Sequence, residues 1–143
     1  MIVKTILSAK GSDVISIEPA ATLETAVRTL ADHRIGALLV LGPDRRVIGI
    51  LSERDIVRVL AEQGAGALNQ PLSQVMTRKV VTCNSSETIG VIMERMTAGK
   101  FRHVPVVEQD QVIGVVSIGD VVKYRLQEME HESAALRDYI QTA

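Results

Sequence analysis

The sequence predicts an α/β (α+β) fold in which one β-α-β-β-α unit occurs twice in tandem. Two matches within the chain support this prediction: residues 14–23 resemble residues 80–89, and residues 47–57 resemble residues 112–122. The first match has an offset of 66 positions and the second an offset of 65. The missing residue falls between Val40 and Val47, where the stretch 42–45, Gly-Pro-Asp-Arg, is typical of a turn. A repeat that changes its spacing only at a turn indicates duplicated structure.

The first repeat predicts its elements from apolar spacing and capping residues. Residues 14–17 form a short apolar strand, and Thr22 then caps a helix whose apolar side chains recur at helical spacing. The unbroken apolar run 37–41 is typical of a strand buried on both faces. Residues 47–51 give a further strand, and Ser52 caps the helix that follows it.

The second repeat predicts the same elements further along the chain. Strands are expected at residues 80–83, 104–107 and 112–116, with one helix near 87–97 and another after Ser117.

The chain divides into two repeats and a helical extension. Residues 64–71 form a short linker rich in small residues, so the two repeats should pack together. The expected units are 1–66, the first repeat with an N-terminal segment, then 67–125, the second repeat, and 126–143, the extension.

The extension continues the last helix to about residue 140 and has an apolar stripe. The stripe follows a heptad-like spacing that polar Ser133 interrupts. Its members are Val122, Leu126, Met129, Leu136 and Ile140. Two interpretations remain open: the stripe packs on the protein's own core, or it contacts a dimer partner.

Composition limits the function classes. The 16 basic and 17 acidic residues give a formal net charge of −1, so no strong field favours nucleic acid or an anionic membrane as a partner. One Phe and two Tyr are few for a protein that stacks single-stranded bases. The chain starts with no signal peptide, no apolar run approaches the roughly 18 residues of a membrane helix, and the single cysteine allows no internal disulfide. A cytoplasmic protein is therefore expected.

Both repeats contain the pattern Gly-x-x-Ser-x-x-Asp, at residues 49–55 and 114–120, across an expected strand-to-helix junction. Ser and Asp three residues apart can form a capping box that satisfies the first amides of the helix. The same helix start can present free amides to an anion, while the carboxylate accepts the hydroxyls of a ribose. Two matched occurrences favour the ligand-binding interpretation, although duplicated capping would give the same pattern.

The stretch 101–106, Phe-Arg-His-Val-Pro-Val, places a basic pair directly before a buried strand. A cation there needs a partner, and the planar guanidinium of Arg102 suits a phosphate. The alternative is that Arg102 pairs with Asp120 or with a surface acid.

No residue set indicates catalysis. Cys83 stands where the first repeat has Ile17, which indicates a core position. Three dispersed histidines and one cysteine make no metal-ligand pattern, and no nucleophile–base pair or Gly-rich phosphate loop is found. We therefore expect no catalytic residue, no metal site and no enzyme activity.

Taken together, the two Gly-x-x-Ser-x-x-Asp segments and the stretch 101–107 resemble the CBS domain family, and the pair resembles a Bateman module. The resemblance covers about residues 4–124, and the chain looks like the small bacterial proteins that consist of a CBS pair and little else. It implies a pseudo-twofold pair with two clefts between the repeats, often assembled into a flat dimer. Modules of this kind bind AMP, ADP, ATP, NAD(H) or S-adenosylmethionine.

The resemblance also implies which residues contact the ligand. The Asp of each motif holds the ribose beside the Ser of that motif, while basic residues such as Arg102, His103 and Arg54 meet the phosphates. The whole implied set is Lys10, Ile15, Gly36, Ala37, Ser52, Arg54, Asp55, Val81, Phe101, Arg102, His103, Pro105, Ser117 and Asp120.

The two implied clefts differ in composition. The adenine contacts implied for the Asp120 cleft are Ile15, Gly36 and Ala37, with Lys10 nearby. Those implied for the Asp55 cleft are Val81 and the segment 101–103. The first repeat has Gly-Ala at residues 36–37 where the second has the basic pair, so one basic pair would serve two clefts.

The predicted function is a regulatory module that binds an adenine nucleotide and signals to a partner protein that the sequence does not identify. AMP is the first candidate ligand, with ATP, ADP and NAD(H) as others. A homodimer is expected, while nucleic acid and membrane are not expected as partners. The alternative is a dimerisation scaffold whose clefts stay empty.

Overall fold

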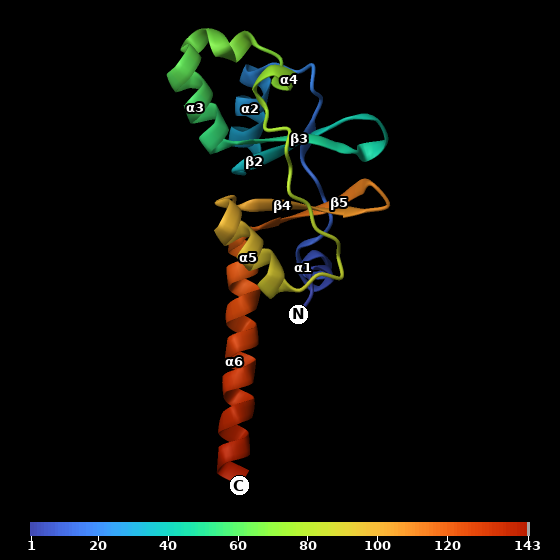
Figure 1. Ribbon diagram of the computed structural model, residues 1–143, viewed down its shortest axis with the longest axis vertical. Helices are drawn as coiled ribbons and strands as arrows, with labels where there is room; N and C mark the ends of the chain where they lie inside the picture. The colour runs from blue at the N-terminus through green and yellow to red at the C-terminus, as the bar shows by residue number, and fades with distance from the viewer. Residues whose placement is uncertain (143) are drawn as a thin grey trace.

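The computed structural model describes residues 1–142 and confirms two repeats of mixed helix and strand. The first repeat holds a sheet in the order β1-β2-β3, formed by β1 (Ser16–Ile17), β2 (Ala37–Leu41) and β3 (Val47–Ser52). β1 runs parallel to β2, and β3 runs antiparallel to it. Helices α2 (Leu23–His33) and α3 (Glu53–Gln63) lie on the side of this sheet that faces away from the second repeat (Figure 1).

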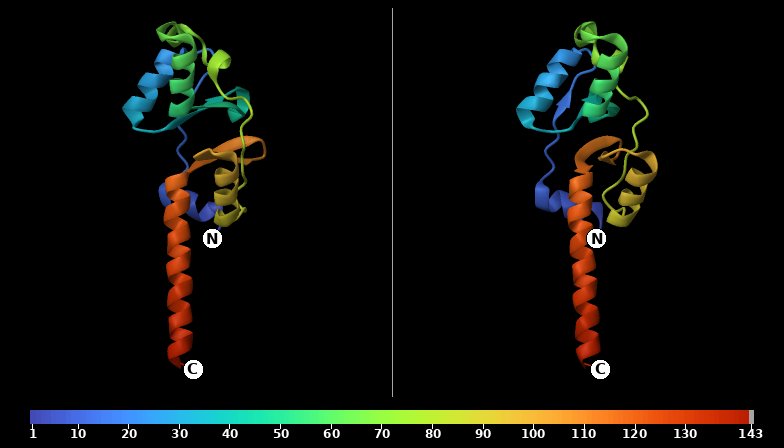
Figure 2. Two further views of the ribbon diagram at one scale, coloured as in Figure 1. Left: turned by 60° about the vertical axis from the view of Figure 1, so that its left-hand side comes forward. Right: turned by 90° about the vertical axis from the view of Figure 1, so that its left-hand side faces the viewer.

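The second repeat has the same order with a smaller sheet. β4 (His103–Glu108) and β5 (Gln111–Ser117) pair antiparallel, and α5 (Ile89–Gly99) precedes them. The remaining elements are α1 (Val3–Lys10), η1 (Pro43–Arg45), η2 (Ala65–Asn69), α4 (Leu72–Val75) and α6 (Ile118–Thr142). Figure 2 shows the sheets of the two repeats next to each other in the middle of the body.

Capping residues set the helix starts. Thr22 and Ser52 cap α2 and α3 as predicted, and the Thr22 hydroxyl accepts the amide of Thr25 at 3.2 Å. The helix expected near residues 87–97 begins at Ile89 instead, because Thr88 is its N-cap.

The predicted strand at residues 80–83 is wrong, since only Cys83 makes a parallel bridge, to Val106. The Cys83 amide donates to the Pro105 carbonyl at 3.0 Å, and its carbonyl accepts from the strand amide two residues further on at 2.8 Å. Extending this ladder toward residue 81 needs the amide of residue 105, which proline lacks. The first repeat has Leu39 at the matching place, and there β1 pairs through both Ser16 and Ile17.

Each repeat is preceded by a helix that packs into the core of the other repeat. α1 precedes the first repeat, yet Val3 and Ile6 are buried in the core of the second. α4 precedes the second repeat, yet Leu72 and Val75 are buried in the core of the first. Such short helices cannot bury apolar side chains alone and need an existing sheet to pack on. The expected boundaries 1–66 and 67–125 therefore divide the chain by sequence order, whereas each hydrophobic core includes one helix from the other unit.

This exchange explains the glycine of the Gly-x-x-Ser-x-x-Asp pattern. A Cβ added at Gly114 of β5 would lie 2.5 Å from Cδ2 of Leu7 on α1, closer than two carbons approach without a bond. A Cβ at Gly49 of β3 would meet Met76, directly after α4, in the same way. Each glycine thus lets the helix before one repeat reach a strand of the other.

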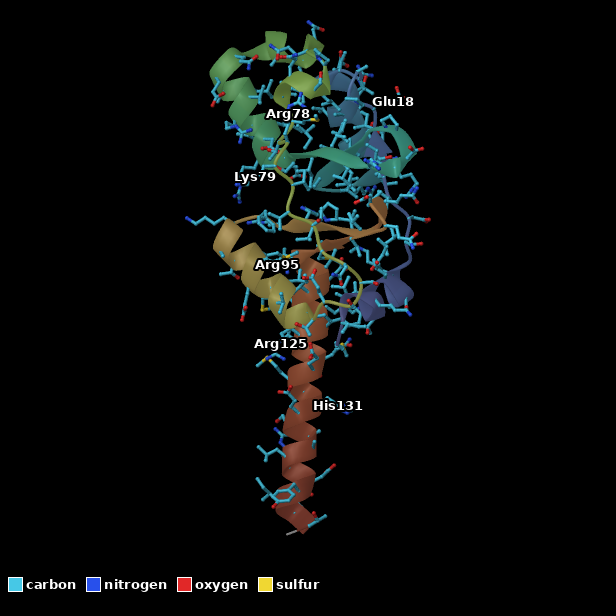
Figure 3. All side chains as sticks on the ribbon, turned by 45° about the vertical axis from the view of Figure 1, so that its right-hand side comes forward. Glu18, Arg78, Lys79, Arg95, Arg125 and His131 are labelled. Atoms are coloured by element: carbon cyan, nitrogen blue, oxygen red, sulfur yellow. The ribbon has the colours of Figure 1, made fainter. Side chains whose placement is uncertain are left out.

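The first turns of α6 pack on the body, and the rest of the helix projects from it. Val121 and Tyr124 are buried in the core of the second repeat, and all residues 129–142 are exposed. Figure 3 places Arg125 near the body and His131 on the projecting part. Among residues 1–142, no helix has the length and apolarity needed to cross a membrane.

The apolar stripe of α6 does not pack on the protein's own core. Its side chains are exposed, with fractions of 43% for Val122, 54% for Leu126, 51% for Met129, 59% for Leu136 and 65% for Ile140. The first of the two interpretations drawn from the sequence is therefore wrong. The last residue of the predicted extension, Ala143, lies outside the described residues.

We expect Gly114→Ala to lower the free energy of unfolding by about 1–3 kcal/mol, because the new methyl group overpacks against Leu7. Urea denaturation followed by circular dichroism measures the change. In a Leu7→Ala background the methyl group finds space, so the same substitution should cost less by about 0.5–3 kcal/mol. An equal cost in both backgrounds would contradict the proposed contact. Gly90→Ala is the control, since beyond its chain neighbours and the backbone of its own helix no heavy atom lies within 4 Å of its added Cβ.

Candidate functional site

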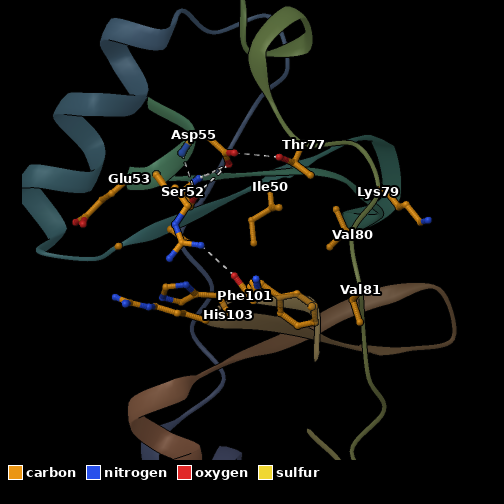
Figure 4. A pocket seen from close by; sticks show the side chains of 16 residues that line it. Ile50, Ser52, Glu53, Asp55, Thr77, Lys79, Val80, Val81, Phe101 and His103 are labelled. Atoms are coloured by element: carbon orange, nitrogen blue, oxygen red, sulfur yellow. Dashed lines mark hydrogen bonds between the residues drawn. The ribbon is translucent and has the colours of Figure 1, made fainter. Parts of the chain in front are cut away.

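A cavity of about 710 Å³ lies between the two repeats (Figure 4). Its volume falls in the roughly 300–1,000 Å³ range of small-molecule sites. The first repeat contributes residues 36–37 and the junction of β3 with α3, and the second contributes residues 99–103. The chain between the repeats closes one side with residues 77 and 79–81. The shape of the cavity therefore depends on how the two repeats are held together.

Part of the cavity wall is apolar. Ile50 reaches into it from β3, and Phe101 lies opposite, from the second repeat (Figure 4). Val80 and Val81 line the side between them. Because residues 80–81 pair with no strand among residues 1–142, their amides and carbonyls are available to a ligand.

Cationic side chains outnumber carboxylates around the cavity. The cations are Arg54, Lys79, Lys100 and Arg102, and the carboxylates are Glu53 and Asp55. Arg54 donates to the Lys100 carbonyl at 3.1 Å and so links the two repeats. Arg102 is exposed and makes no ion pair within residues 1–142. The alternative pairing of Arg102 with Asp120 or a surface acid is therefore wrong.

Asp55 forms a capping box with Ser52 at the start of α3. Its Oδ2 accepts from the Ser52 amide at 2.9 Å and from the Ser52 hydroxyl at 3.0 Å. Its Oδ1 accepts from the Thr77 hydroxyl at 3.2 Å and pairs with Arg58 at 3.1 Å. A carboxylate offers about four lone-pair sites, so protein groups already use the full capacity of Asp55. The capping interpretation is confirmed here.

The same geometry recurs with Ser117 and Asp120 at the start of α6. Asp120 Oδ2 accepts from the Ser117 amide at 2.9 Å and from its hydroxyl at 3.0 Å. Lys10 donates to this same oxygen at 2.7 Å and to the Val115 carbonyl at 3.0 Å. Burial disfavours the charged carboxylate, but the hydrogen bonds from Lys10 and Ser117 outweigh it and hold the pKa of Asp120 below its ordinary value. Asp120 Oδ1 accepts no hydrogen bond from residues 1–142.

His103 lies at the edge of the cavity, at the start of β4. Burial and the nearby Lys10 cation lower its pKa below the ordinary value. Glu53 opposes this shift, and a Cβ added at Gly36 would lie 3.5 Å from the imidazole. A neutral imidazole at pH 7 follows, so His103 can donate a hydrogen bond there without adding a charge.

The structure gathers most of the implied ligand-binding residues at one cavity. Those that line it are Gly36, Ala37, Ser52, Arg54, Asp55, Val81, Phe101, Arg102 and His103. The resemblance assigns Gly36 and Ala37 to the Asp120 cleft, whereas the structure places them on the same cavity wall as Asp55.

The other implied residues lie away from this cavity. Lys10, Ser117 and Asp120 form the second capping cluster. Pro105 is buried within β4, and Ile15 packs against the core of the first repeat.

Several residues that line the cavity were not found from the sequence. They are Ile50, Glu53, Thr77, Lys79, Val80, Gly99 and Lys100. The repeat offered a signal for Lys100, because Arg34 stands 66 positions before it. Both residues end their helices in the left-handed conformation, with φ of 54° for Arg34 and 57° for Lys100. Thr77 and Lys79 had no such signal, because their positions follow from the path of the chain between the repeats.

The buried thiol of the chain lies outside the cavity. Cys83 is a core residue, as predicted, and burial raises the pKa of its thiol to about 12. Among residues 1–142, no group of three or more His, Cys, Asp or Glu side chains could hold a metal ion.

Comparisons with known proteins agree with the fold. A crystal structure of the CBS-domain containing protein ATU1752 from Agrobacterium tumefaciens is 47% identical, with a TM-score of 0.83 over 87% of this chain and 92% of that one. The CBS domain-containing protein CBSX3 of Arabidopsis thaliana, described as mitochondrial, is 35% identical over 84% of this chain, which spans 60% of that protein's length. The CBS domain protein PAE2072 from Pyrobaculum aerophilum, complexed with AMP, is 27% identical, with a TM-score of 0.74 over 84% of this chain and 89% of that one.

The family model for the CBS domain matches residues 3–62 and again residues 72–127. These two matches cover both repeats, including the strand-to-helix junctions at Ser52 and Ser117. The chain therefore belongs to the CBS domain family, as a pair of CBS domains.

Proposed function

We propose that the cavity between the repeats binds an adenine nucleotide of the AMP type and that the chain reports its occupancy to a partner protein. The observation that supports this most is the combination of an apolar slot with cations that lack acidic partners, Arg102 above all. A nucleotide needs both features, because its base is flat and largely apolar whereas its phosphate is anionic. The AMP complex of PAE2072 supports the ligand class.

In the proposed arrangement, the base lies between Ile50 and Phe101, beside the backbone of Val81. The phosphate lies toward Arg102, which can form two parallel hydrogen bonds to it. Lys100 adds a second cation from the same loop. His103, neutral at pH 7, donates one further hydrogen bond.

In this arrangement the ribose hydroxyls find no free hydrogen-bond acceptor on the motif carboxylate. Asp55 is the motif carboxylate that lines the cavity, but its lone pairs already accept from Ser52, Thr77 and Arg58. A ribose hydroxyl therefore has to displace Thr77 or Arg58 before Asp55 accepts it. Such an exchange would change the contacts at the start of α3, which gives the ligand a way to alter the protein.

Signalling in this proposal arises from the position of the cavity. Its two walls belong to different repeats, and the hydrogen bond from Arg54 to the Lys100 carbonyl spans them. A ligand that contacts both walls favours one relative position of the repeats over others, and a partner protein can distinguish these positions. The regulatory role follows from binding, and it needs no catalytic residue.

A scaffold without ligand is the second candidate. The observation that favours it is that both motif carboxylates are engaged by the protein, Asp55 by Arg58 and Asp120 by Lys10. In this case the Gly-x-x-Ser-x-x-Asp patterns serve only to cap α3 and α6.

AMP should raise the melting temperature of the protein by several degrees at 100 times its dissociation constant. A ligand that binds only the folded state contributes about 2.7 kcal/mol at that concentration. Differential scanning fluorimetry with AMP, ADP, ATP, NAD, NADH and S-adenosylmethionine measures the effect, with GMP as the control for the base. If none of the adenine ligands shifts the transition at millimolar concentration, the scaffold becomes the better proposal.

Arg102→Ala should weaken AMP binding about tenfold and adenosine binding less than twofold, because it removes a charge-assisted hydrogen bond to the phosphate only. Isothermal titration calorimetry with both ligands measures the two ratios. Arg46→Ala is the matched control, since Arg46 is an exposed arginine outside the cavity. Equal losses for AMP and adenosine would remove Arg102 from the phosphate site.

The pH dependence of AMP binding tests His103. The folded protein holds the pKa of His103 below its ordinary value, and a bound phosphate favours the protonated ring, so AMP binding becomes coupled to proton uptake by His103 as the pH falls. Protonation of the phosphate near pH 6 acts in the opposite direction. Between pH 7.5 and 5.5, the AMP affinity relative to adenosine should therefore fall less in the native protein than in His103→Asn. Parallel profiles for the two proteins would exclude His103 from the phosphate site.

A further inference from the structure

The projecting part of α6 has one apolar face with regular spacing. The exposed stripe residues and Ser133 are separated alternately by four and three positions. This spacing assigns heptad position a to Leu126, Ser133 and Ile140, and position d to Val122, Met129 and Leu136. From Val122 to Ile140 the face is about 27 Å long at 1.5 Å per residue.

The protein's own body uses a different face of α6. Val121 and Tyr124 are buried in the core of the second repeat, and Glu128 accepts from the N-terminal amine of Met1 at 3.2 Å. At 100° per residue, these side chains point roughly 130° away from the apolar stripe. The body thus holds the helix by one face and leaves the a and d positions open to a partner.

We propose that the projecting part of α6 forms a parallel two-stranded coiled coil with α6 of a second copy of this chain. The charges beside the stripe support this occupant. Position g holds Arg125 and Glu132, and position e holds Glu130 and Arg137. In a parallel pair, each g residue faces the e residue of the next heptad on the other helix. Arg125 then faces Glu130 of the partner subunit, and Glu132 faces Arg137 of the partner subunit, with both pairs repeated by the twofold symmetry.

The reversed orientation is opposed by the same charges. In a fully overlapping antiparallel pair, g residues face g residues and e residues face e residues. Glu130 then faces Glu130 of the partner subunit, and Glu132 faces Glu132 of the partner subunit. Lys123, also at position e, faces Arg137 of the partner subunit. These three contacts join like charges, and the remaining g contact, between Arg125 and Tyr139 of the partner subunit, forms no ion pair, so the parallel pair is selected.

Two further features fit a self-pairing helix. Ser133 puts one polar residue in the middle of an apolar seam, which lowers stability but disfavours shifted registers. The segment 122–142 also mixes acidic and basic side chains nearly equally, so it lacks the basic face with which a helix binds an anionic membrane. This inference does not depend on nucleotide binding.

Sedimentation velocity at about 100 μM tests the pairing. We expect a dimer for the native chain and a monomer for Met129→Glu/Leu136→Glu, which places charges in two d layers. The control Gln127→Glu/Gln141→Glu adds the same charge outside the seam and should remain a dimer. All four positions are exposed, so the melting temperature of the monomeric variant should match that of the diluted native chain. A monomeric native chain, or a dimer that survives the seam variant, would overturn the proposal.

Disulfide formation tests the orientation. Ile140→Cys should cross-link under mild oxidation, because a parallel pair brings the two positions together in one layer, whereas an antiparallel pair holds them far apart. Asp138→Cys, on the opposite face of the same turn, should not. The native Cys83 is buried and should not react. A dimer in which Ile140→Cys fails to cross-link, or in which both variants cross-link equally, would exclude the parallel seam.

Discussion

The reciprocal exchange of α1 and α4 between the repeats is the interaction on which the rest of this structure depends. Each repeat has a sheet with helices on one side, and the remaining apolar surface is covered by the helix that precedes the other repeat. Ile6 of α1 and Leu72 of α4 stand 66 positions apart, and both are fully buried. Ile6 lies in the core of the second repeat, and Leu72 lies in the core of the first. Separating the repeats would expose both helices, so the cost of moving them apart is shared by two cores. The cavity between the repeats exists because this exchange fixes its opposite walls.

The sequence differences between the two repeats determine which backbone groups and charges line the cavity. At one matched position the first repeat has Leu39 and the second has Pro105, so only the first completes a three-stranded sheet. The backbone of residues 80–81 is left unpaired on one side of the cavity. At another matched position the first repeat has Gly36 and the second has Arg102, which puts a cation on one wall and a residue without a side chain on the other. A symmetric duplication would have given two equal clefts, whereas these substitutions concentrate backbone groups and positive charge in one.

Local patterns predicted the fold well because most elements here are defined by their own residues. The apolar run of β2, the N-caps Thr22 and Ser52 and the turn between β2 and β3 all lie within a few positions of the structure that they cause. The contacts that local patterns did not predict depend on partners far along the chain. α1 packs on the second repeat, which no local pattern indicated. Lys10 lies beside Asp120 across 110 positions, and only the family resemblance suggested that they are close. Lys79 and Thr77 reach the cavity only through the path that the chain takes between the repeats.

α6 shows why a correctly identified heptad pattern does not reveal what packs against its apolar face. The heptad spacing is a property of the helix alone, but its use depends on which face the body covers. Val121 and Tyr124 anchor the first turns, and their direction determines that the a and d positions point to solvent. If the body covered the stripe, no second helix could pack there, and the charged residues at positions e and g would have no partner helix to pair with. The face of α6 that the body covers lies beside the stripe and not over it. One helix can therefore pack on the second repeat and still present a self-complementary surface. In the proposed dimer, the two CBS pairs would then lie side by side at one end of the coiled coil.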